Sequence, residues 1–592
     1  MGFCPETRSF SNSTYAVIVV NVNLDLLADT DRNGTIDSND ETGKATNTTT
    51  RGALIPPPLR LLVAQPTSNS LTSLATIKIS VSPTAPAPGM KIKLKKKYEP
   101  AGCTLSFVLS DGTKLPDISS GQAYSFADWP TNVITLRVQP QYARPLTTSF
   151  RPIRFDLELQ AVDANDKVLG SDVAQLKVAP MILPPECNAA QSVYSTENWN
   201  IPGVTCMNTA SATQWAQDMV KFVKYQVASG QTKDMCVDLD HPDKGDFLSK
   251  LRNPGNWDGV MPWVDSMRGD GGSIMATPSF GTNVFGAIMI GDRQDADYHA
   301  EWQGQGIQPV ITVPTDWLYV GHVDEILMWV ATNKVLYADP WKAADLLHQE
   351  IAAGHQTNGL WYGTLPNGTN CTIQQVVIAT GTSGYKLTTL PLPGLSNSTL
   401  AATLVFTNAI FALNDILRVD DEILQVTTVN GPTVTVARAQ ATRPAAVHVT
   451  GSVIYAYNDL LKDNLPVGTN SVIAQISNAT NRLQQALGTF IPTFVPIPVL
   501  FPYVVTANGN KYFAGSANAA NCLLGMGGTI YYSKTGCNVF RDYISSVLPT
   551  AQEVPGVWNE LHCYYGEIHC GTAAQRQLNL AAPWWQQVTN WE

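Results

Sequence analysis

Two short segments, far apart in the chain, hold the residue types best suited to chemistry. Residues 565–572 read Tyr-Gly-Glu-Ile-His-Cys-Gly-Thr, which places Cys570 between a histidine and a glycine-threonine turn. Upstream, His322 and Asp324 stand two residues apart, a spacing that points both side chains to one face of a strand. A thiol, an imidazole and carboxylates are the groups needed to attack a cationic carbon and to move its protons. We therefore expect a cysteine nucleophile that acts on a guanidinium group.

Composition limits the partners and the architecture. A chain of 592 residues is too long for one hydrophobic core, and 44% hydrophobic with 15% charged residues is typical of globular proteins. The net charge of −10 argues against a nucleic-acid partner and mildly favours a cationic substrate. No run reaches the roughly 18 apolar residues of a membrane span. We expect several domains, no nucleic-acid partner and no membrane segment.

Other features indicate a secreted glycoprotein. The glycosylation acceptor sequences and the ten cysteines suggest export, although the N-terminus shows no basic region followed by an apolar one; we therefore expect a secreted mature form whose signal peptide was removed. Cys187 with Cys206, and Cys522 with Cys537, are predicted disulfides. Asn-X-Ser/Thr acceptor sequences occur at Asn12, Asn33, Asn47, Asn367, Asn370, Asn397 and Asn478.

Residues 15–180 are expected to form an antiparallel β-sandwich. Short apolar or alternating runs are separated there by turns rich in Pro, Gly and Asn. The predicted strands are 15–22, 77–81, 104–109, 133–138 and 154–161. The segment from Pro180 to Pro185 is predicted to be a linker.

From about residue 190 onward, strands and helices alternate, which indicates an α/β domain. Residues 372–455 interrupt that rhythm, and Asn430-Gly431 between two apolar runs predicts a hairpin. We interpret this stretch as a β domain inserted in a surface loop. Predicted helices are 212–227, 341–353 and 471–487, and predicted buried strands are 287–290 and 309–313.

Both reactive segments resemble those of a known family. Residues 315–325 are similar to the histidine segment of the protein-arginine deiminases, and residues 565–572 to their cysteine segment. The resemblance extends from about residue 15 to the end, without the insertion and without the additional N-terminal domain of vertebrate members. Further matches are residues 178–182, 192–194, 215–218 (Trp-Ala-Gln-Asp), 279–281 (Ser-Phe-Gly), 288–292, 354–355 and 584–585.

The resemblance implies an α+β multidomain protein. Residues 1–183 would form an immunoglobulin-like β-sandwich, and residues 184–592 a catalytic five-bladed α/β propeller of the pentein superfamily. The small β domain at 372–455 would be inserted in the propeller. The implied reaction is the hydrolysis of peptidyl-arginine to peptidyl-citrulline and ammonia, with arginine-containing proteins or peptides as partners.

The resemblance also assigns a role to each reactive residue. Asp218 and Asp324 would hold the guanidinium by bidentate, charge-assisted bonds. Cys570 would attack the central carbon and form a thiouronium intermediate. His322 would protonate the departing ammonia and then activate water. Trp215 would pack along the aliphatic stem of the substrate arginine.

Two parts of the sequence bear on calcium binding. In calcium-activated members, acidic residues near the guanidinium-binding aspartate ligate the ion, but here those places hold Met219, Lys221 and Val284. Since an ammonium cannot ligate a hard cation that takes about six to eight oxygens, we expect catalysis without calcium. A structural calcium is predicted separately in residues 29–40, which have calcium-loop spacing, with ligands Asp29, Asp31, Asn33, Thr35, Asp37 and Asp40.

Other functions stay open at this point. A deiminase of free arginine or agmatine, or an amidinotransferase, would use the same propeller and the same Cys/His/carboxylate set. The sandwich argues against these enzymes, because members acting on small substrates usually lack it. A non-catalytic surface or adhesion protein is suggested by the β domains and the glycosylation sequences. A Cys/His/Asp protease is a further alternative, although no matching signature surrounds Cys570.

Overall fold

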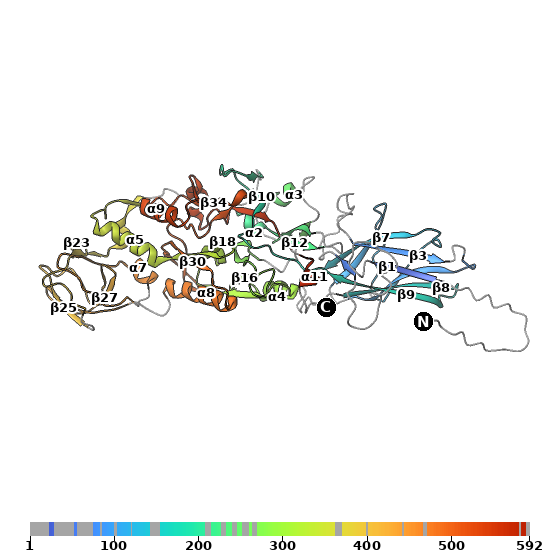
Figure 1. Ribbon diagram of the computed structural model, residues 1–592, viewed down its shortest axis with the longest axis horizontal. Helices are drawn as coiled ribbons and strands as arrows, with labels where there is room; N and C mark the ends of the chain where they lie inside the picture. The colour runs from blue at the N-terminus through green and yellow to red at the C-terminus, as the bar shows by residue number, and fades with distance from the viewer. Residues whose placement is uncertain are drawn as a thin grey trace, which may run out of the picture.

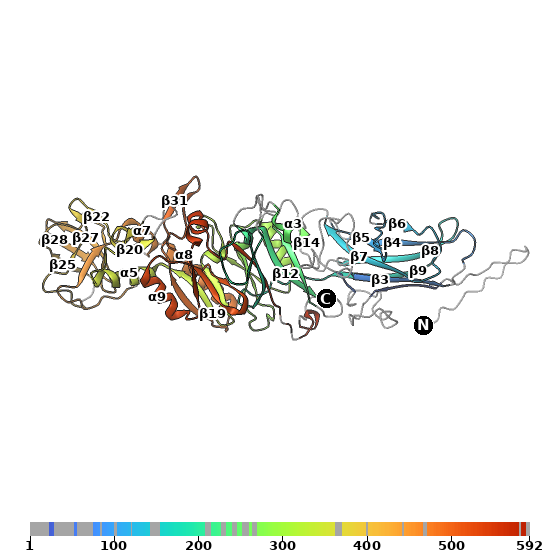
Figure 2. The ribbon, with the colours of Figure 1, turned by 90° about the horizontal axis from the view of Figure 1, so that it is seen from above.

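The computed structural model describes most of the chain, in segments. The described parts form an elongated molecule, with a β-sandwich at one end, a mixed α/β region in the middle and a small β domain at the other end (Figure 1, Figure 2). The predicted strand at 15–22 and the predicted calcium loop at 29–40 lie outside them. The described residues are 23–28, 53–55, 75–82, 86–99, 103–119, 121–142, 154–207, 215–226, 232–239, 246–251, 260–262, 269–361, 370–397, 401–440, 443–465, 471–578, 580 and 582–587.

Two sheets make up the sandwich, ordered β1-β3-β7-β5 and β2-β9-β8-β4-β6. Alternate side chains such as Ile77 and Ile79 on one sheet, and Leu157 and Leu159 on the other, fill a common core. The predicted strands within the described residues are confirmed, while the immunoglobulin-like assignment stays a prediction. The strands are β1 (Asn23–Ala28), β2 (Ala53–Ile55), β3 (Ala75–Ser82), β4 (Lys91–Tyr98), β5 (Cys103–Leu109), β6 (Ala123–Ser125), β7 (Ile134–Tyr142), β8 (Arg154–Val162) and β9 (Val168–Val178).

The segment after β9 is not the linker that the sequence predicts. Residues 180–185 are buried. The backbone of Ile182 exchanges two hydrogen bonds with that of Lys224 (2.7 and 2.8 Å), and the Leu183 N–H donates to Gln308 Oε1 (2.8 Å). Because the α/β region supplies partners for these buried backbone groups, the junction is a packed part of that region.

Within the described residues, the α/β region contains five three-stranded sheets with one shared pairing pattern. In each sheet the middle strand pairs antiparallel with one neighbour and parallel with the other. The last strand, β36, pairs with the first, β10, and so joins the two ends of the region. The sheets are β11-β10-β36 (Val204–Cys206, Ala190–Ser195, Thr572–Arg576), β12-β13-β14 (Val220–Gln226, Thr232–Asp238, Val260–Pro262), β15-β16-β17 (Ile274–Ala276, Ile288–Gly291, Val310–Val313), β18-β19-β30 (Leu327–Ala331, Lys334–Asp339, Thr493–Pro498) and β33-β34-β35 (Leu523–Leu524, Ile530–Ser533, Gln552–Val554).

Two long helices form where the apolar residues recur with a helical period. α5 (Pro340–Ala352) begins after Asp339, whose carboxylate accepts hydrogen bonds from the N–H groups of Trp341 and Lys342. α8 (Val472–Leu487) buries one apolar stripe along its length. Both predicted helices, and the predicted strands at 287–290 and 309–313, are confirmed. The other helices are α2 (Ala216–Met219), α3 (Phe247–Leu251), α4 (Ala296–Gln305), α6 (Ile373–Val377), α7 (Asp459–Asn464), α9 (Asn538–Val547), α10 (Val557–Glu560), α11 (Trp584–Gln587) and the 3-10 turns η2 (Gly271–Ser273), η3 (Val323–Glu325), η4 (Met526–Gly528) and η5 (His562–Tyr564).

The helix predicted at 212–227 is wrong. The described part of this range forms a single turn, α2, followed by strand β12. Every residue of β12 is buried, and the strand pairs along its full length with β13. A strand buried on both faces need not alternate apolar and polar residues, so its sequence cannot be told from a helix by periodicity alone.

The small β domain is one six-stranded sheet, ordered β24-β29-β26-β27-β28-β25. The hairpin predicted at Asn430-Gly431 is confirmed, with Gly431 at a φ of +58°. The sheet begins later than residue 372, because residues 373–377 form helix α6 and pack with α5. Its strands are β24 (Leu387–Thr389), β25 (Ala401–Val405), β26 (Ile416–Val419), β27 (Glu422–Asn430), β28 (Thr433–Ala437) and β29 (Val453–Ala456); short pairs elsewhere are β20-β21 (Gly359–Trp361, Asn370–Thr372), β22-β23 (Thr380–Gly381, Gly384–Tyr385) and β31-β32 (Tyr503–Thr506, Gly509–Tyr512).

Both predicted disulfides are wrong. Among the described residues, no disulfide joins Cys187 to Cys206 or Cys522 to Cys537. Cys522 packs in the core of the α/β region, whereas Cys537 belongs to a separate cluster around α5. No helix in the described part of the chain has both the length and the apolar character needed to cross a membrane.

Candidate active site

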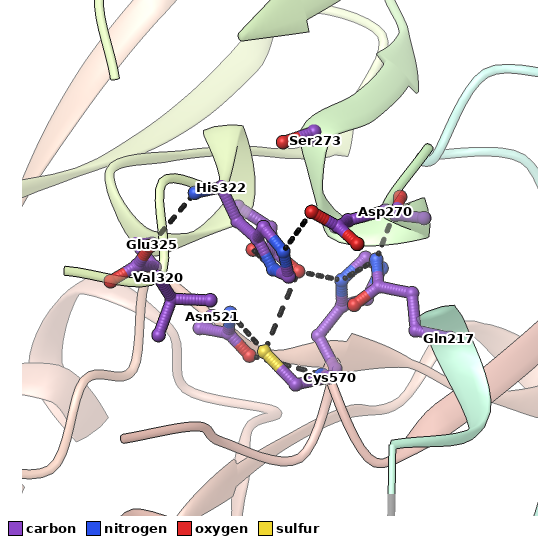
Figure 3. A network of polar contacts seen from close by, with 12 residues as sticks. Gln217, Asp270, Ser273, Val320, His322, Glu325, Asn521 and Cys570 are labelled. Atoms are coloured by element: carbon purple, nitrogen blue, oxygen red, sulfur yellow. Dashed lines mark hydrogen bonds and ion pairs between the residues drawn. The ribbon is translucent and has the colours of Figure 1, made fainter. Parts of the chain in front are cut away.

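Each of the five three-stranded sheets supplies one polar side chain to the same centre. In every sheet this residue lies just upstream of the strand that runs antiparallel to the middle strand. Figure 3 shows the side chains of three of them converging. Equivalent strand ends therefore meet at this point. The five residues are Asp218 before β12, Asp270 before β15, Asp324 before β18, Asn521 before β33 and Cys570 before β36.

The Cys570 thiol is buried, with 4% of the residue exposed, and has polar groups on two sides. Asn521 Nδ2 lies 3.1 Å from Sγ, and Asn521 Oδ1 accepts a hydrogen bond from the Cys570 N–H (3.4 Å). Asp324 Oδ2 lies 3.8 Å from Sγ. The Gln217 N–H donates to the Cys570 carbonyl (3.2 Å), which ties the cysteine turn to the helical turn that carries Asp218.

His322 lies among three carboxylates. Its Nε2 is 3.6 Å from Asp270 Oδ2 and 3.9 Å from Asp218 Oδ1, and its Nδ1 is 4.0 Å from Asp324 Oδ1. Burial lowers the pKa of the imidazole, but Asp218 and Asp270 outweigh burial and raise this pKa well above its usual range. His322 is therefore an imidazolium that can donate a proton at neutral pH.

The strand predicted at His322 is wrong, although both reactive side chains still face the centre. Residues 323–325 form the 3-10 turn η3, and His322 precedes it. Glu325 Oε1 accepts hydrogen bonds from the N–H groups of His322 (2.8 Å) and Gly321 (3.0 Å). Gly321 has a φ of +92°, which glycine adopts without strain. The buried Glu325 carboxylate thus replaces the backbone partners that a strand would have provided.

Close packing of glycines against rings fixes the other side of the centre. The Gly272 N–H donates to Asp218 Oδ1 (3.2 Å), and a Cβ on Gly272 would overlap the His322 ring. A Cβ on Gly566 would likewise overlap the Trp215 ring. Trp215 therefore lies directly against the segment that leads to Cys570.

Without a bound cation, Cys570 is a neutral thiol at neutral pH. Burial and the Asp324 carboxylate raise the pKa of this thiol to about 12, against the opposing effect of His322. Three carboxylates facing one imidazolium favour the binding of a further cation. A cation bound between Asp218 and Asp324 would lower the pKa of the thiol when the nucleophile is needed.

This charge distribution predicts that a cationic alkylating agent reacts faster with Cys570 than a neutral one. At neutral pH, chloroacetamidine should alkylate Cys570 about 10- to 1,000-fold faster than its neutral analogue chloroacetamide, because a nearby opposite charge moves a pKa by about one to three units. Mass spectrometry of the peptide that contains Cys570 measures both rates. Equal rates would contradict the proposed electrostatics.

Two groups of side chains have spacing suited to a metal ion: His322 with Asp324 and Cys570, and His322 with Asp218 and Asp270. Both groups need His322 as a ligand. In the imidazolium, both ring nitrogens carry protons and neither can ligate a metal. The donor set therefore fits an organic cation better than a metal ion.

The structure brings together the four reactive residues singled out in the sequence, Cys570, His322, Asp218 and Asp324. It adds Asp270 and Asn521, which the sequence analysis missed because neither stands in a distinctive motif. Their one usable signal is the position just upstream of a buried strand, which all five residues share. The predicted calcium ligands lie outside the described residues, namely Asp29, Asp31, Asn33, Thr35, Asp37 and Asp40.

A buried cysteine, an imidazolium and carboxylates meet where the repeated sheets converge, and these are the groups that a cysteine enzyme acting on a cationic group needs. Residues 202–379 match the profile of the family described as protein-arginine deiminase (PAD). This match supports the family assignment predicted from the motifs. The match supports a hydrolase that acts on guanidino groups. No curated protein sequence matches the chain.

Several solved structures are similar to the chain at low scores. An agmatine deiminase of C. jejuni has a TM-score of 0.34 and 8% identity, over 68% of this chain and 98% of its own. A lipoprotein of Bacteroides thetaiotaomicron has a TM-score of 0.12 and 17% identity, over 20% of this chain and 72% of its own. BcpA, the major pilin subunit of Bacillus cereus, has a TM-score of 0.16 and 10% identity, over 30% of this chain and 42% of its own. At these scores none of the three defines the fold.

Proposed function

We propose that the protein hydrolyses peptidyl-arginine to peptidyl-citrulline and ammonia, with Cys570 as the nucleophile. The observation that carries this proposal is the convergence of one thiol, one imidazolium and three carboxylates in a buried centre. A guanidinium is planar and permanently charged, so opposed carboxylates can hold it by paired charge-assisted bonds.

Binding comes first. Asp218 and Asp324 hold the guanidinium nitrogens, and Trp215 covers the aliphatic stem of the arginine. Asp324 Oδ1 is buried without a hydrogen-bond partner, so it is free to accept from the substrate. The bound cation lowers the pKa of Cys570, so the thiol loses its proton to solvent. The resulting thiolate faces the central guanidinium carbon.

The reaction then proceeds in two half-reactions, formation and hydrolysis of a covalent intermediate. The Cys570 sulfur bonds to the guanidinium carbon, His322 donates its proton to one amino group, and the carbon–nitrogen bond breaks to release ammonia. The product is a thiouronium on Cys570. Water then attacks the same carbon while neutral His322 takes a proton. The carbon–sulfur bond breaks, which leaves a ureido group on the substrate and the thiol on the enzyme.

A peptide substrate is proposed because the matched family is named for protein arginine. An arginine with blocked amino and carboxyl ends should be hydrolysed with a kcat/KM at least about 10-fold above that of free arginine, since remote contacts contribute binding energy. Ammonia and ureido-group assays on both substrates test this. Faster turnover of free arginine or agmatine would support a small-molecule deiminase instead, and transfer of the amidino group to an added amine would support an amidinotransferase.

Catalysis is proposed to need no calcium. Lys221 is the second residue of β12, the strand that follows the helical turn carrying Asp218. Its ammonium lies 3.2 Å from both Glu186 Oε1 and the Gly271 carbonyl oxygen. A cation is thus already built into the chain beside the guanidinium-binding carboxylates. Activity should stay within about twofold in excess chelator, and activity that is lost and then restored by Ca²⁺ would contradict this.

Three further points are proposed from the sequence. Residues 29–40 would bind a structural calcium, which titration of the full chain with Ca²⁺ by calorimetry would detect. The shared pairing of the five sheets supports their arrangement as a five-bladed α/β propeller. The acceptor sequences support a secreted glycoprotein, which a mass shift on enzymatic deglycosylation of native protein would reveal.

A further inference from the structure

A chain of buried charged groups lies behind the guanidinium-binding carboxylates, and the proposed reaction does not use it. His569 Nδ1 donates to Asp324 Oδ2 (2.8 Å), and His569 Nε2 lies 3.6 Å from Glu186 Oε2. Two cations complete the chain at Glu186: Arg576 Nε donates to Oε2 (2.8 Å), and Lys221 Nζ donates to Oε1 (3.2 Å). All five side chains are less than 9% exposed.

The same group of residues also reaches the second carboxylate. Lys221 Nζ donates to the Gly271 carbonyl (3.2 Å), and the N–H of the next residue, Gly272, donates to Asp218 Oδ1 (3.2 Å). The Gln217 amide lies 2.8 Å from His569 Nδ1 and 3.4 Å from the Gly271 carbonyl oxygen. One buried charge cluster is therefore in contact with the supports of both Asp218 and Asp324.

The cluster leaves no room for a hydrated ion. A cavity of about 10 Å³ borders Glu186, Gln217, Lys221 and His569, which is about the size of one water molecule. Isolated charges are strongly disfavoured at such depth, so each carboxylate here needs the cations next to it. The cations that meet this need belong to the protein itself.

We infer that Glu186 is a positioning residue for substrate binding: with Lys221 and Arg576 it holds His569, and His569 holds Asp324 with Oδ1 turned free toward the guanidinium. This inference rests on the proposed function, because it assigns a purpose to Asp324 as a guanidinium ligand. It goes further by naming residues behind the guanidinium-binding carboxylates that determine substrate affinity.

The protonation states agree with this arrangement. Burial raises the pKa of Glu186, but Lys221 and Arg576 reverse the effect and hold this pKa well below its usual range. Burial lowers the pKa of His569, but Asp324 and Glu186 outweigh it and raise this pKa. The ionisable groups that face His569 are Asp324 and Glu186, with Lys221 and Arg576 behind Glu186.

The test compares Glu186→Gln with a control variant on strand β12, which also carries Lys221. Lys224→Gln is a matched control: Lys224 is buried on β12, as Lys221 is, but pairs with Asp234 away from the centre. Glu186→Gln should raise KM for an arginine peptide by roughly 10- to 100-fold with a smaller change in kcat, as expected for loss of a bond to a charged group. It should also reduce the preference of Cys570 for chloroacetamidine over chloroacetamide. Glu186→Asp should restore part of the affinity.

The double variant Glu186→Gln/Lys221→Met removes both charges of one buried ion pair. It serves as the second variant in case Glu186→Gln alone fails to fold. If this folded variant, or Glu186→Gln, keeps the native KM and alkylation preference, the inference is wrong. That result leaves the proposed function intact, because the function fails separately if Cys570→Ser retains activity. A raised KM in both variants, with the Lys224→Gln control unchanged, supports the inference.

Discussion

Cys570→Ser is expected to lower citrulline formation by at least about 10⁴-fold, because the hydroxyl is a far weaker nucleophile toward a guanidinium carbon and no base stands ready to ionise it. Its neighbours are the Asn521 amide, which can donate to it, the Asp324 carboxylate and the protonated His322 ring (Figure 3). None of these would ionise a hydroxyl at neutral pH. Because serine is nearly isosteric, the carboxylates should still bind an arginine peptide with near-native affinity.

Cys563→Ala provides the control for Cys570→Ser. Cys563 lies in the same segment but packs in a separate cluster with Ala517 and Trp558. This variant should keep native turnover. Full activity in Cys570→Ser would remove the thiol from the mechanism and would revive the interpretation of the chain as a non-catalytic surface protein with a contaminating activity.

Asp324→Asn is the second change with a large expected effect. It keeps the shape of the side chain but leaves both the substrate guanidinium and the His569 ring without their shared anion. Truncating one partner of a buried charge pair costs about 2–5 kcal/mol, so kcat/KM should fall roughly 30- to 4,000-fold. Steady-state kinetics with an arginine peptide measures the loss.

Asp316→Asn is a matched control for this change, since Asp316 is exposed and pairs with Lys511 near the same segment. The control should keep kcat/KM within about twofold, as exposed ion pairs contribute little. If Asp324→Asn and Asp316→Asn behave alike, Asp324 is not a guanidinium ligand. Chloroacetamidine should also lose most of its advantage in Asp324→Asn, since the carboxylate nearest the thiol is gone.

The sequence predicted the reactive residues better than the elements that carry them. Cys570, His322, Asp218 and Asp324 could be found because thiol, imidazole and carboxylates stand in short motifs of characteristic order. The conformation around His322 could not be found, since the choice of a 3-10 turn depends on Glu325 capping two backbone N–H groups. Such a cap is visible only once the chain is folded.

Tertiary burial explains the other errors. β12 was taken for part of a helix because its apolar and polar residues do not alternate strictly, and only pairing with β13 shows that it is a strand. The segment from Pro180 to Pro185 has the composition of a linker, yet its backbone groups find partners in the α/β region. The cluster around Glu186 unites segments from both ends of that region, a closeness that no local pattern indicates.

The central claim, a covalent intermediate on Cys570, is tested most directly by trapping it. The native enzyme would be mixed with an arginine peptide, quenched in acid within one turnover, and digested for mass mapping. We expect a thiouronium adduct on the peptide containing Cys570 that is present during turnover and disappears once the substrate is exhausted. Citrulline formed without any such adduct, or an adduct on a different residue, would contradict it.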